Sequence, residues 1–178
     1  MVDPNTLTGP ARRIQMVITC GVVLLVVLAV VLAYGAVTEP ADTGENIARV
    51  SGLLTGPMQA WQNAVLLGVA ALHLAIWIVL LATARRMFGH LAEGDPETAG
   101  HVARTLSRWL WALLALGLMS QMIVSFVATW DFPDGERSVS LGVGTPQISV
   151  ALSALIAGFM ARAFALGAEL WRDHREVV

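Results

Sequence analysis

Charged residues are scarce in this chain of 178 residues. Only 13% of the sequence is Asp, Glu, Lys or Arg, whereas 56% is hydrophobic. A soluble domain carries about 25% charged residues, so an ordinary soluble enzyme is excluded. The high hydrophobic content and the net charge of −2 also exclude an intrinsically disordered chain. The same small net charge gives no indication of direct nucleic-acid binding.

Cysteine pairs and recognisable catalytic motifs are also missing. Cys20 is the single cysteine, which excludes an intrachain disulfide and a CxxC metal or redox site. The sequence has no Walker loop, GxSxG elbow, HExxH motif, dinucleotide-binding fingerprint or EF-hand loop. Its long apolar runs contain no carboxylate, which argues against a transporter coupled to protons or sodium ions. We therefore expect no enzyme activity, no catalytic residue, no metal and no cofactor.

Four long apolar runs dominate what is present, over about residues 14–37, 62–84, 110–129 and 148–166. Each approaches or exceeds the roughly 20 residues that cross a membrane as a helix. Because every backbone polar group must be bonded within the bilayer, the runs are predicted to be helices. The first run is longer than the apolar region of a signal peptide, so we interpret it as a retained span. The sequence predicts an all-α polytopic membrane protein, with residues 1–178 forming one up-down bundle of four transmembrane helices.

The arginines predict the orientation of these spans. The chain has no lysine, and only Arg49 and Arg137 fall on one side of the predicted topology. By the positive-inside rule, both termini and the middle connection lie in the cytoplasm, as in a bacterial inner-membrane protein. Arg162 is expected to reach the lipid headgroups from the last span, and the arginines of the middle connection to contact anionic lipid. The nine cytoplasmic arginines are Arg12, Arg13, Arg85, Arg86, Arg104, Arg108, Arg162, Arg172 and Arg175.

The middle connection predicts a helical hairpin that extends beyond the membrane. Gly94, Asp95 and Pro96 are suited to a helix end, an N-cap and a first helical position. The flanking helices would each be about 35 residues, or roughly 50 Å, so residues 85–109 should project into the cytoplasm. Apolar side chains of this hairpin and of the C-terminal helix form the predicted partner surface, unless these are solvated helix ends with no partner. They are Phe88, Leu91, Val102, Leu106, Leu170 and Trp171.

The first outer connection predicts a short amphipathic helix on the membrane surface, over about Glu45 to Leu54. Ile47, Val50 and Leu54 recur there at helical spacing. In the third connection, apolar residues alternate with Ser and Gly over residues 139–143, which predicts an extended segment across the mouth of the bundle.

Small residues recur at helical spacing in three of the four runs. Such faces let helices approach closely, and they serve a bundle or a homo-oligomer equally well. The three faces are Ala29, Ala33 and Ala36; Ala64, Gly68, Ala71 and Ala75; and Ala151, Ala154, Gly158, Ala161 and Ala165.

His73 and Gln121 are predicted to form a polar pair inside the membrane. His73 lies near the middle of the second run and Gln121 at a similar depth in the third. A hydrogen bond between them is the simplest interpretation, because an intramembrane polar group needs a partner. A small molecule or quinone headgroup at His73 is the alternative. A transmembrane haem is disfavoured because no other run contains a histidine.

Several segments, which together cover nearly the whole chain, resemble a known family. The sequence RRMFGHLAEGDP at residues 85–96 leads into VARTL at residues 102–106. Phe164, Gly167 and Leu170 then precede a short tail that ends in Glu176 and two valines. Together these segments resemble the YoaS-like family of small four-span bacterial membrane proteins, a domain of unknown function. The family is often encoded beside a small helix-turn-helix regulator, so the resemblance implies a regulator as partner.

We therefore expect a non-catalytic membrane protein that contacts lipids and binds a protein partner through its cytoplasmic helix ends. That partner is expected to be a small DNA-binding regulator, which would make this chain a membrane-tethered modulator. The alternative is an accessory subunit whose helix faces pack into a larger membrane complex. A third hypothesis is a ligand-binding or lipid-binding protein that uses a cavity near His73.

Overall fold

The computed structural model describes residues 5–50, 58–131 and 139–176. Within these ranges the chain forms α1 (Asn5–Thr38), α2 (Pro40–Val50), α3 (Ala60–Ala92), α4 (Pro96–Ala128) and α5 (Thr145–Glu176), and it forms no strand. Helices α1, α3, α4 and α5 are each long and apolar enough to cross a membrane. The predicted all-α fold with four spanning helices is confirmed, and the chain is a multi-pass membrane protein.

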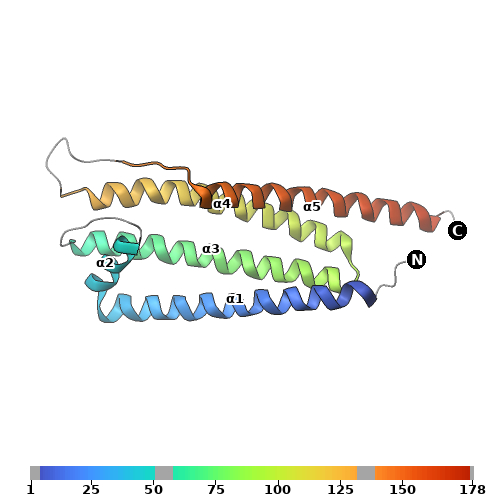
Figure 1. Ribbon diagram of the computed structural model, residues 1–178, viewed down its shortest axis with the longest axis horizontal. Coiled ribbons are helices and arrows are strands. Elements are labelled where there is room, and N and C mark those ends of the chain that lie inside the picture. The colour runs from blue at the N-terminus through green and yellow to red at the C-terminus, as the bar shows by residue number, and fades with distance from the viewer. Residues whose placement is uncertain (1–4, 51–57, 132–138, 177–178) are drawn as a thin grey trace.

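The four long helices run up and down in the order of the chain (Figure 1). The start of α1 and the end of α5 lie at the same end as the α3–α4 turn, which we call the arginine end, and α2 lies at the opposite end, the loop end. Helix α3 packs against α1 and α4, and α5 packs against α4. Across the described ranges, α1 makes no extensive contact with α4 or α5. Within the described residues the bundle is therefore an open row of helices, without an extensive contact between α1 and α5.

The turn at the arginine end follows the prediction. Gly94 has φ +76°, a left-handed conformation that glycine adopts without strain. Asp95 caps α4 by accepting a hydrogen bond from the Thr98 backbone N–H at 3.0 Å, and Pro96 is the first helical residue. Helices α3 and α4 each have 33 residues, or about 50 Å at 1.5 Å per residue. They are longer than the roughly 30 Å hydrocarbon layer.

The amphipathic helix of the first connection is present, with different bounds and a different buried face. Helix α2 begins at Pro40 rather than near Glu45, and residues 51–57 lie outside the described part of the chain. Its buried residues are Gly44 and Ala48, whereas Val50 is 90% exposed. Small residues occupy the buried face because α2 lies directly against α3. A Cβ on Gly44 would come within 2.6 Å of Asn63 Cγ.

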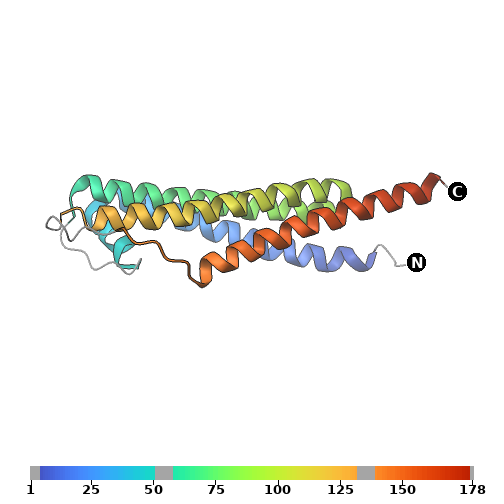
Figure 2. The same ribbon diagram turned by 90° about the horizontal axis from the view of Figure 1, so that it is seen from above.

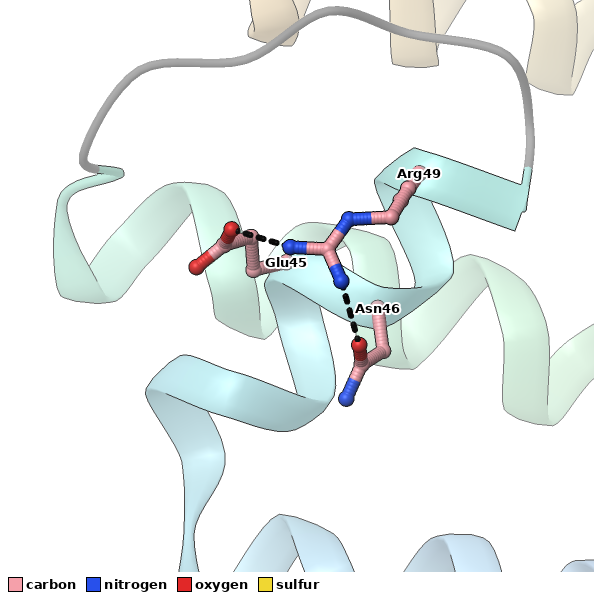
Figure 3. Close-up of polar contacts among 3 residues, drawn as sticks. All are labelled: Glu45, Asn46 and Arg49. Atoms are coloured by element: carbon pink, nitrogen blue, oxygen red, sulfur yellow. Dashed lines mark hydrogen bonds and ion pairs between the residues drawn. The ribbon is translucent and has the colours of Figure 1, made fainter.

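The opposite face of α2 carries its charges. Arg49 forms an ion pair of 2.7 Å with Glu45, one helical turn earlier, and donates a weaker hydrogen bond of 3.4 Å to Asn46 (Figure 3). All three side chains are exposed, so this pair contributes little to stability. It nevertheless fits a helix with one buried and one solvated face.

Helix α5 is displaced toward the arginine end. The Ser107 hydroxyl donates to the Ala154 carbonyl at 2.9 Å, and this contact fixes the level of α5 on α4. Helix α5 begins nine residues before Ala154, about 14 Å along the axis, whereas α4 continues for 21 residues beyond Ser107, about 32 Å. The loop end of α4 therefore extends about 18 Å past the start of α5, as Figure 2 shows.

Candidate functional site

The arginine end carries a band of exposed, unpaired cations on all four long helices. None of these side chains forms an ion pair within the described part of the chain. Arg85 precedes the end of α3 by seven residues and Arg104 follows the start of α4 by eight, so both lie about 10–12 Å from the turn. Such a band is suited to lipid phosphates. Its exposed members are Arg13, Arg85, Arg86, Arg104, Arg108 and Arg162.

A crevice of about 360 Å³ lies between α1 and α3 within this band. Arg85, Arg86 and His90 line it from α3, and Gln15 lines it from α1. Guanidinium and amide N–H groups are the donors that bind phosphate oxygens. Glu93 also borders the crevice, and one of its carboxylate oxygens lies 3.7 Å from His90 Nδ1. Arg85 and Arg86, which the sequence predicts to contact lipid, therefore border a crevice that also holds other hydrogen-bond donors.

Three helices build a packed core at the arginine end. We call residues 85–109 of α3 and α4, together with residues 159–167 of α5, the head. Its buried centre consists of Met87, Ala99, Ala103 and Ala161. The predicted partner residues of the hairpin pack against this centre and are only partly exposed, so they hold the head together more than they present a surface. They are Phe88, Leu91, Val102 and Leu106. The side chains of Leu170 and Trp171 lie outside the described part of α5.

The outward side of α5 leaves apolar side chains uncovered along the head. Phe159 is 74% exposed and Leu166 is 61% exposed. A Cβ on Gly100 would lie 3.2 Å from Phe164 Cβ, so this stretch of α5 is level with the first turns of α4. The predicted span over residues 148–166 agrees with the candidate span Thr145–Gly167. The position of α5 along α4 could not be predicted, because only the contacts between the two helices show it.

His73 and Gln121 line one pocket, but they bond to separate backbone groups. His73 Nδ1 lies 3.0 Å from the carbonyl oxygen of Val69, one turn earlier in α3. The Gln121 side-chain oxygen accepts from the Gly142 backbone N–H at 3.0 Å. Both side chains face a pocket between α3 and α4 near the loop end. The two residues therefore line the same pocket, and the hydrogen bond of each goes to a backbone group.

A second polar cluster, which sequence reasoning missed, joins α3 to α4 at the loop end. The Gln62 side chain is buried and donates to the Val127 carbonyl at 3.0 Å and to Asp131 at 3.1 Å. Its side-chain oxygen accepts from the backbone N–H of Gln59, whose own amide donates to Asp131 at 2.9 Å. The signal in the sequence was the pair of amides Gln62 and Asn63 at the start of a span.

An aromatic contact supports the same end of the bundle. Trp61 on α3 meets Trp130, just after α4, edge to face at 5.6 Å between ring centroids. Trp130 also packs edge to face on Phe126 at 5.2 Å. Tryptophan favours membrane interfaces, so this cluster agrees with a membrane boundary near the loop end.

The described residues contain no group of three or more His, Cys, Asp or Glu side chains placed to hold a metal ion. No protein-family model, curated protein or solved structure matches this chain. The head, the arginine band and the pocket between α3 and α4 are therefore interpreted from their own geometry.

Proposed function

We propose that this chain is a non-catalytic protein of the bacterial inner membrane that binds a protein partner through its head. The orientation rests on the arginine band, because positively charged residues flanking spans favour the cytoplasmic side. With the band at the inner headgroups, both termini and the head face the cytoplasm. In this arrangement the arginine band binds lipid phosphates, and the head is accessible to soluble proteins of the cytoplasm.

The observation that carries the proposal is the exposed apolar side of α5 along the head. Phe159 lies at the level of the arginine band, and Leu166 follows it by seven residues, about 10 Å farther along α5 toward the arginine end. Burying a leucine or phenylalanine side chain is worth about 1.5–3 kcal/mol. Exposed apolar side chains on a rigid, packed support are typical of a protein-binding surface. The exposure of these α5 side chains is the observation that supports a protein partner.

The resemblance to the YoaS-like family supports a particular class of partner, a small helix-turn-helix regulator. Binding at the head would hold such a regulator at the membrane and reduce its availability to DNA. The chain itself needs no contact with nucleic acid in this arrangement.

Two variants with the same new charge test the docking surface. Leu166→Glu places a carboxylate on the exposed side of α5, and Thr105→Glu places one on an exposed side of α4 in the same head. Neither side chain is in the buried centre, so both variants should fold. We expect Leu166→Glu to abolish co-purification of the regulator with the full-length protein, and Thr105→Glu to retain it. Equal binding by both variants would contradict the proposed surface.

A second function has its own observation in its favour, a role as an accessory subunit or homo-oligomer. The small-residue face of α5 is used within the chain, but Ala64, Gly68, Ala71 and Ala75 on α3 are all exposed. A Cβ on Gly68 would have no neighbour within 4 Å. Photo-crosslinkers at Ala71 and at Phe159 separate the two functions. Crosslinks to another membrane protein or a second copy at Ala71 would favour the subunit, and crosslinks to a soluble protein at Phe159 would favour the regulator.

A further inference from the structure

An open pocket of about 590 Å³ lies between α3 and α4, in the half of the bundle nearest the loop end. It is separate from the head and plays no part in the proposed docking function. Its walls are mostly apolar, with polar side chains at a few positions. The lining includes Leu66, Val69, Ala70 and His73 from α3, and Ser120, Gln121, Val124 and Ser125 from α4.

The pocket exists because α5 does not cover this part of α4. Two other segments close it instead. Ile47 of α2 contributes one wall, and the segment before α5 contributes another. That segment is tied to α4 at two points: the Ser140 N–H donates to the Ser125 hydroxyl at 2.9 Å, and the Gly142 N–H donates to Gln121 at 3.0 Å. The pocket therefore has fixed walls while α5 leaves a side open toward the membrane.

The hydrogen bonds of His73 and Gln121 define which of their polar atoms remain available to a ligand. A carbonyl oxygen only accepts, so the 3.0 Å contact between His73 Nδ1 and the Val69 carbonyl assigns the proton of the neutral ring to Nδ1. Nε2 is then a hydrogen-bond acceptor with a free lone pair. The Gln121 oxygen is occupied by Gly142, which leaves its amide N–H groups as donors.

We propose that this pocket binds the hydroxyl headgroup of a neutral membrane amphiphile. One hydroxyl group can bind both side chains, because it can donate to His73 Nε2 and accept from the Gln121 amide. None of the described residues that line the pocket is Asp, Glu, Lys or Arg, so this lining offers no charge to pair with a charged phospholipid headgroup. The apolar walls accept a ring or the first carbons of a chain. The ligand enters from the bilayer along the side that α5 leaves open.

The same logic disfavours an oxidised quinone. Its carbonyl oxygens can accept from Gln121, but they cannot donate to the lone pair of His73 Nε2. A phenol, a hydroquinone or an aliphatic alcohol such as diacylglycerol can do both. These compounds share a neutral hydroxyl group, and competition between ligands identifies which class of alcohol the pocket binds.

Two probes that differ only at the oxygen test the proposal on the full-length protein in lipid nanodiscs. They are tritiated 4-nonylphenol and its methyl ether, which lacks the donor hydrogen. We expect the unaltered protein to bind the phenol about tenfold more tightly than the ether, the effect of one unsatisfied polar group. His73→Leu and Gln121→Leu should lose that preference. Ala70→Leu, which fills the pocket without removing a polar group, should weaken both probes.

Thr83→Val is the matched control, because the Thr83 hydroxyl lies on the same helix, bonds to the Val79 carbonyl at 2.7 Å and is outside the pocket. It should bind like the unaltered protein. Equal affinity of the unaltered protein for phenol and ether would overturn the proposal, and this comparison needs no variant to fold. So would an unchanged preference in His73→Leu.

Competition identifies the source. Displacement of the phenol by a decyl hydroquinone, or by dioctanoylglycerol, supports the proposal and assigns an aromatic or an aliphatic alcohol respectively. If neither displaces it, the pocket does not take a membrane alcohol and the proposal fails.

Discussion

The hydroxyl of Ser107 on α4 donates a hydrogen bond of 2.9 Å to the backbone carbonyl of Ala154 on α5. This single contact joins two helices whose small residues meet over several turns. Gly158 lies beside it, where an added Cβ would come within 3.3 Å of the same hydroxyl. The contact marks the level of α5 on α4, and at this level α5 leaves the His73 pocket uncovered.

Removing this hydrogen bond should loosen α5. In Ser107→Ala the Ala154 carbonyl keeps its bond within α5 and loses the second one, so we expect a loss of about 0.6 kcal/mol, typical of interhelical bonds in membranes. Unfolding in mixed micelles with an increasing fraction of a denaturing detergent measures this loss of stability. Ser153→Ala is the control, because the Ser153 hydroxyl bonds to the Ser149 carbonyl of its own helix. A loss as large in the control would show that Ser107 has no special role.

Enlarging a glycine at the α4–α5 contact should separate the two helices at the head. A Cβ on Gly100 would lie 3.2 Å from Phe164 Cβ and 3.5 Å from the Ala161 carbonyl oxygen. Gly100→Leu should therefore cost about 1–3 kcal/mol through overpacking. A Cβ on Gly117, on the same helix, would meet nothing within 4 Å. Gly117→Leu should be tolerated. Distances between spin labels on α4 and α5 would report the separation, and equal distances in both variants would contradict it.

Helix α2 should depend on the absence of a side chain at Gly44. A Cβ there would overlap the Asn63 amide oxygen and come within 2.6 Å of Asn63 Cγ. Asn63 is buried, and its side-chain oxygen has no hydrogen-bond partner in the described structure. Gly44→Ala should displace α2 and weaken its packing against α3 by about 1–3 kcal/mol.

Asn63→Ala removes the two closest obstructing atoms, so Gly44→Ala combined with Asn63→Ala should recover part of that loss. Proteolysis of the first connection measures the docking of α2. Purely additive effects of the two substitutions would mean that they do not touch.

The turn at the arginine end should weaken in acid through Asp95. Hydrogen bonds from the Thr98 side chain and backbone hold the pKa of Asp95 below its ordinary value of 3.8. A group whose pKa is lowered by folding stabilises the folded state above its ordinary pKa, and this contribution disappears as the pH falls through the folded value. The capping contribution should therefore be constant near neutral pH and decline below 3.8.

Asp95→Asn provides the control for this pH dependence, because asparagine also caps helices but does not titrate in this range. Amide hydrogen exchange at Thr98, measured from about pH 5 to about pH 2 and corrected for the intrinsic rate, should show increasing opening in the unaltered protein only. The same increase in Asp95→Asn would assign the change to another group.

The spans and the turn could be predicted because they depend on local sequence. A run of about 20 apolar residues can satisfy its backbone in a bilayer only as a helix, and Gly94, Asp95 and Pro96 each favour one position of a helix–helix turn. Both inferences use only neighbours in the chain. The small-residue face of α5 was also informative, because close helix packing requires small side chains in a regular row.

The remaining features depend on register between helices, which no single helix contains. Phe159 and Leu166 lie within the candidate span of α5, Thr145–Gly167, and the level of α5 on α4 places this stretch beside the first turns of α4. The buried face of α2 followed from its approach to Asn63, so Gly44 and Ala48 replaced the larger apolar residues that its periodicity favoured. The hydrogen bond from Gly142 to the Gln121 oxygen joins residues that are 21 positions apart, and periodicity within one helix does not predict it.

The orientation of the arginine end is the claim on which the partner and lipid proposals both depend. Single-cysteine variants in a Cys20→Ala background test it directly, with Glu97→Cys on the exposed surface of the head and Asn46→Cys on the exposed face of α2. We predict that a membrane-impermeant maleimide labels Glu97→Cys only in inverted inner-membrane vesicles, and labels Asn46→Cys only in intact spheroplasts. Labelling of Glu97→Cys in intact spheroplasts would place the head outside the cytoplasm and contradict the account.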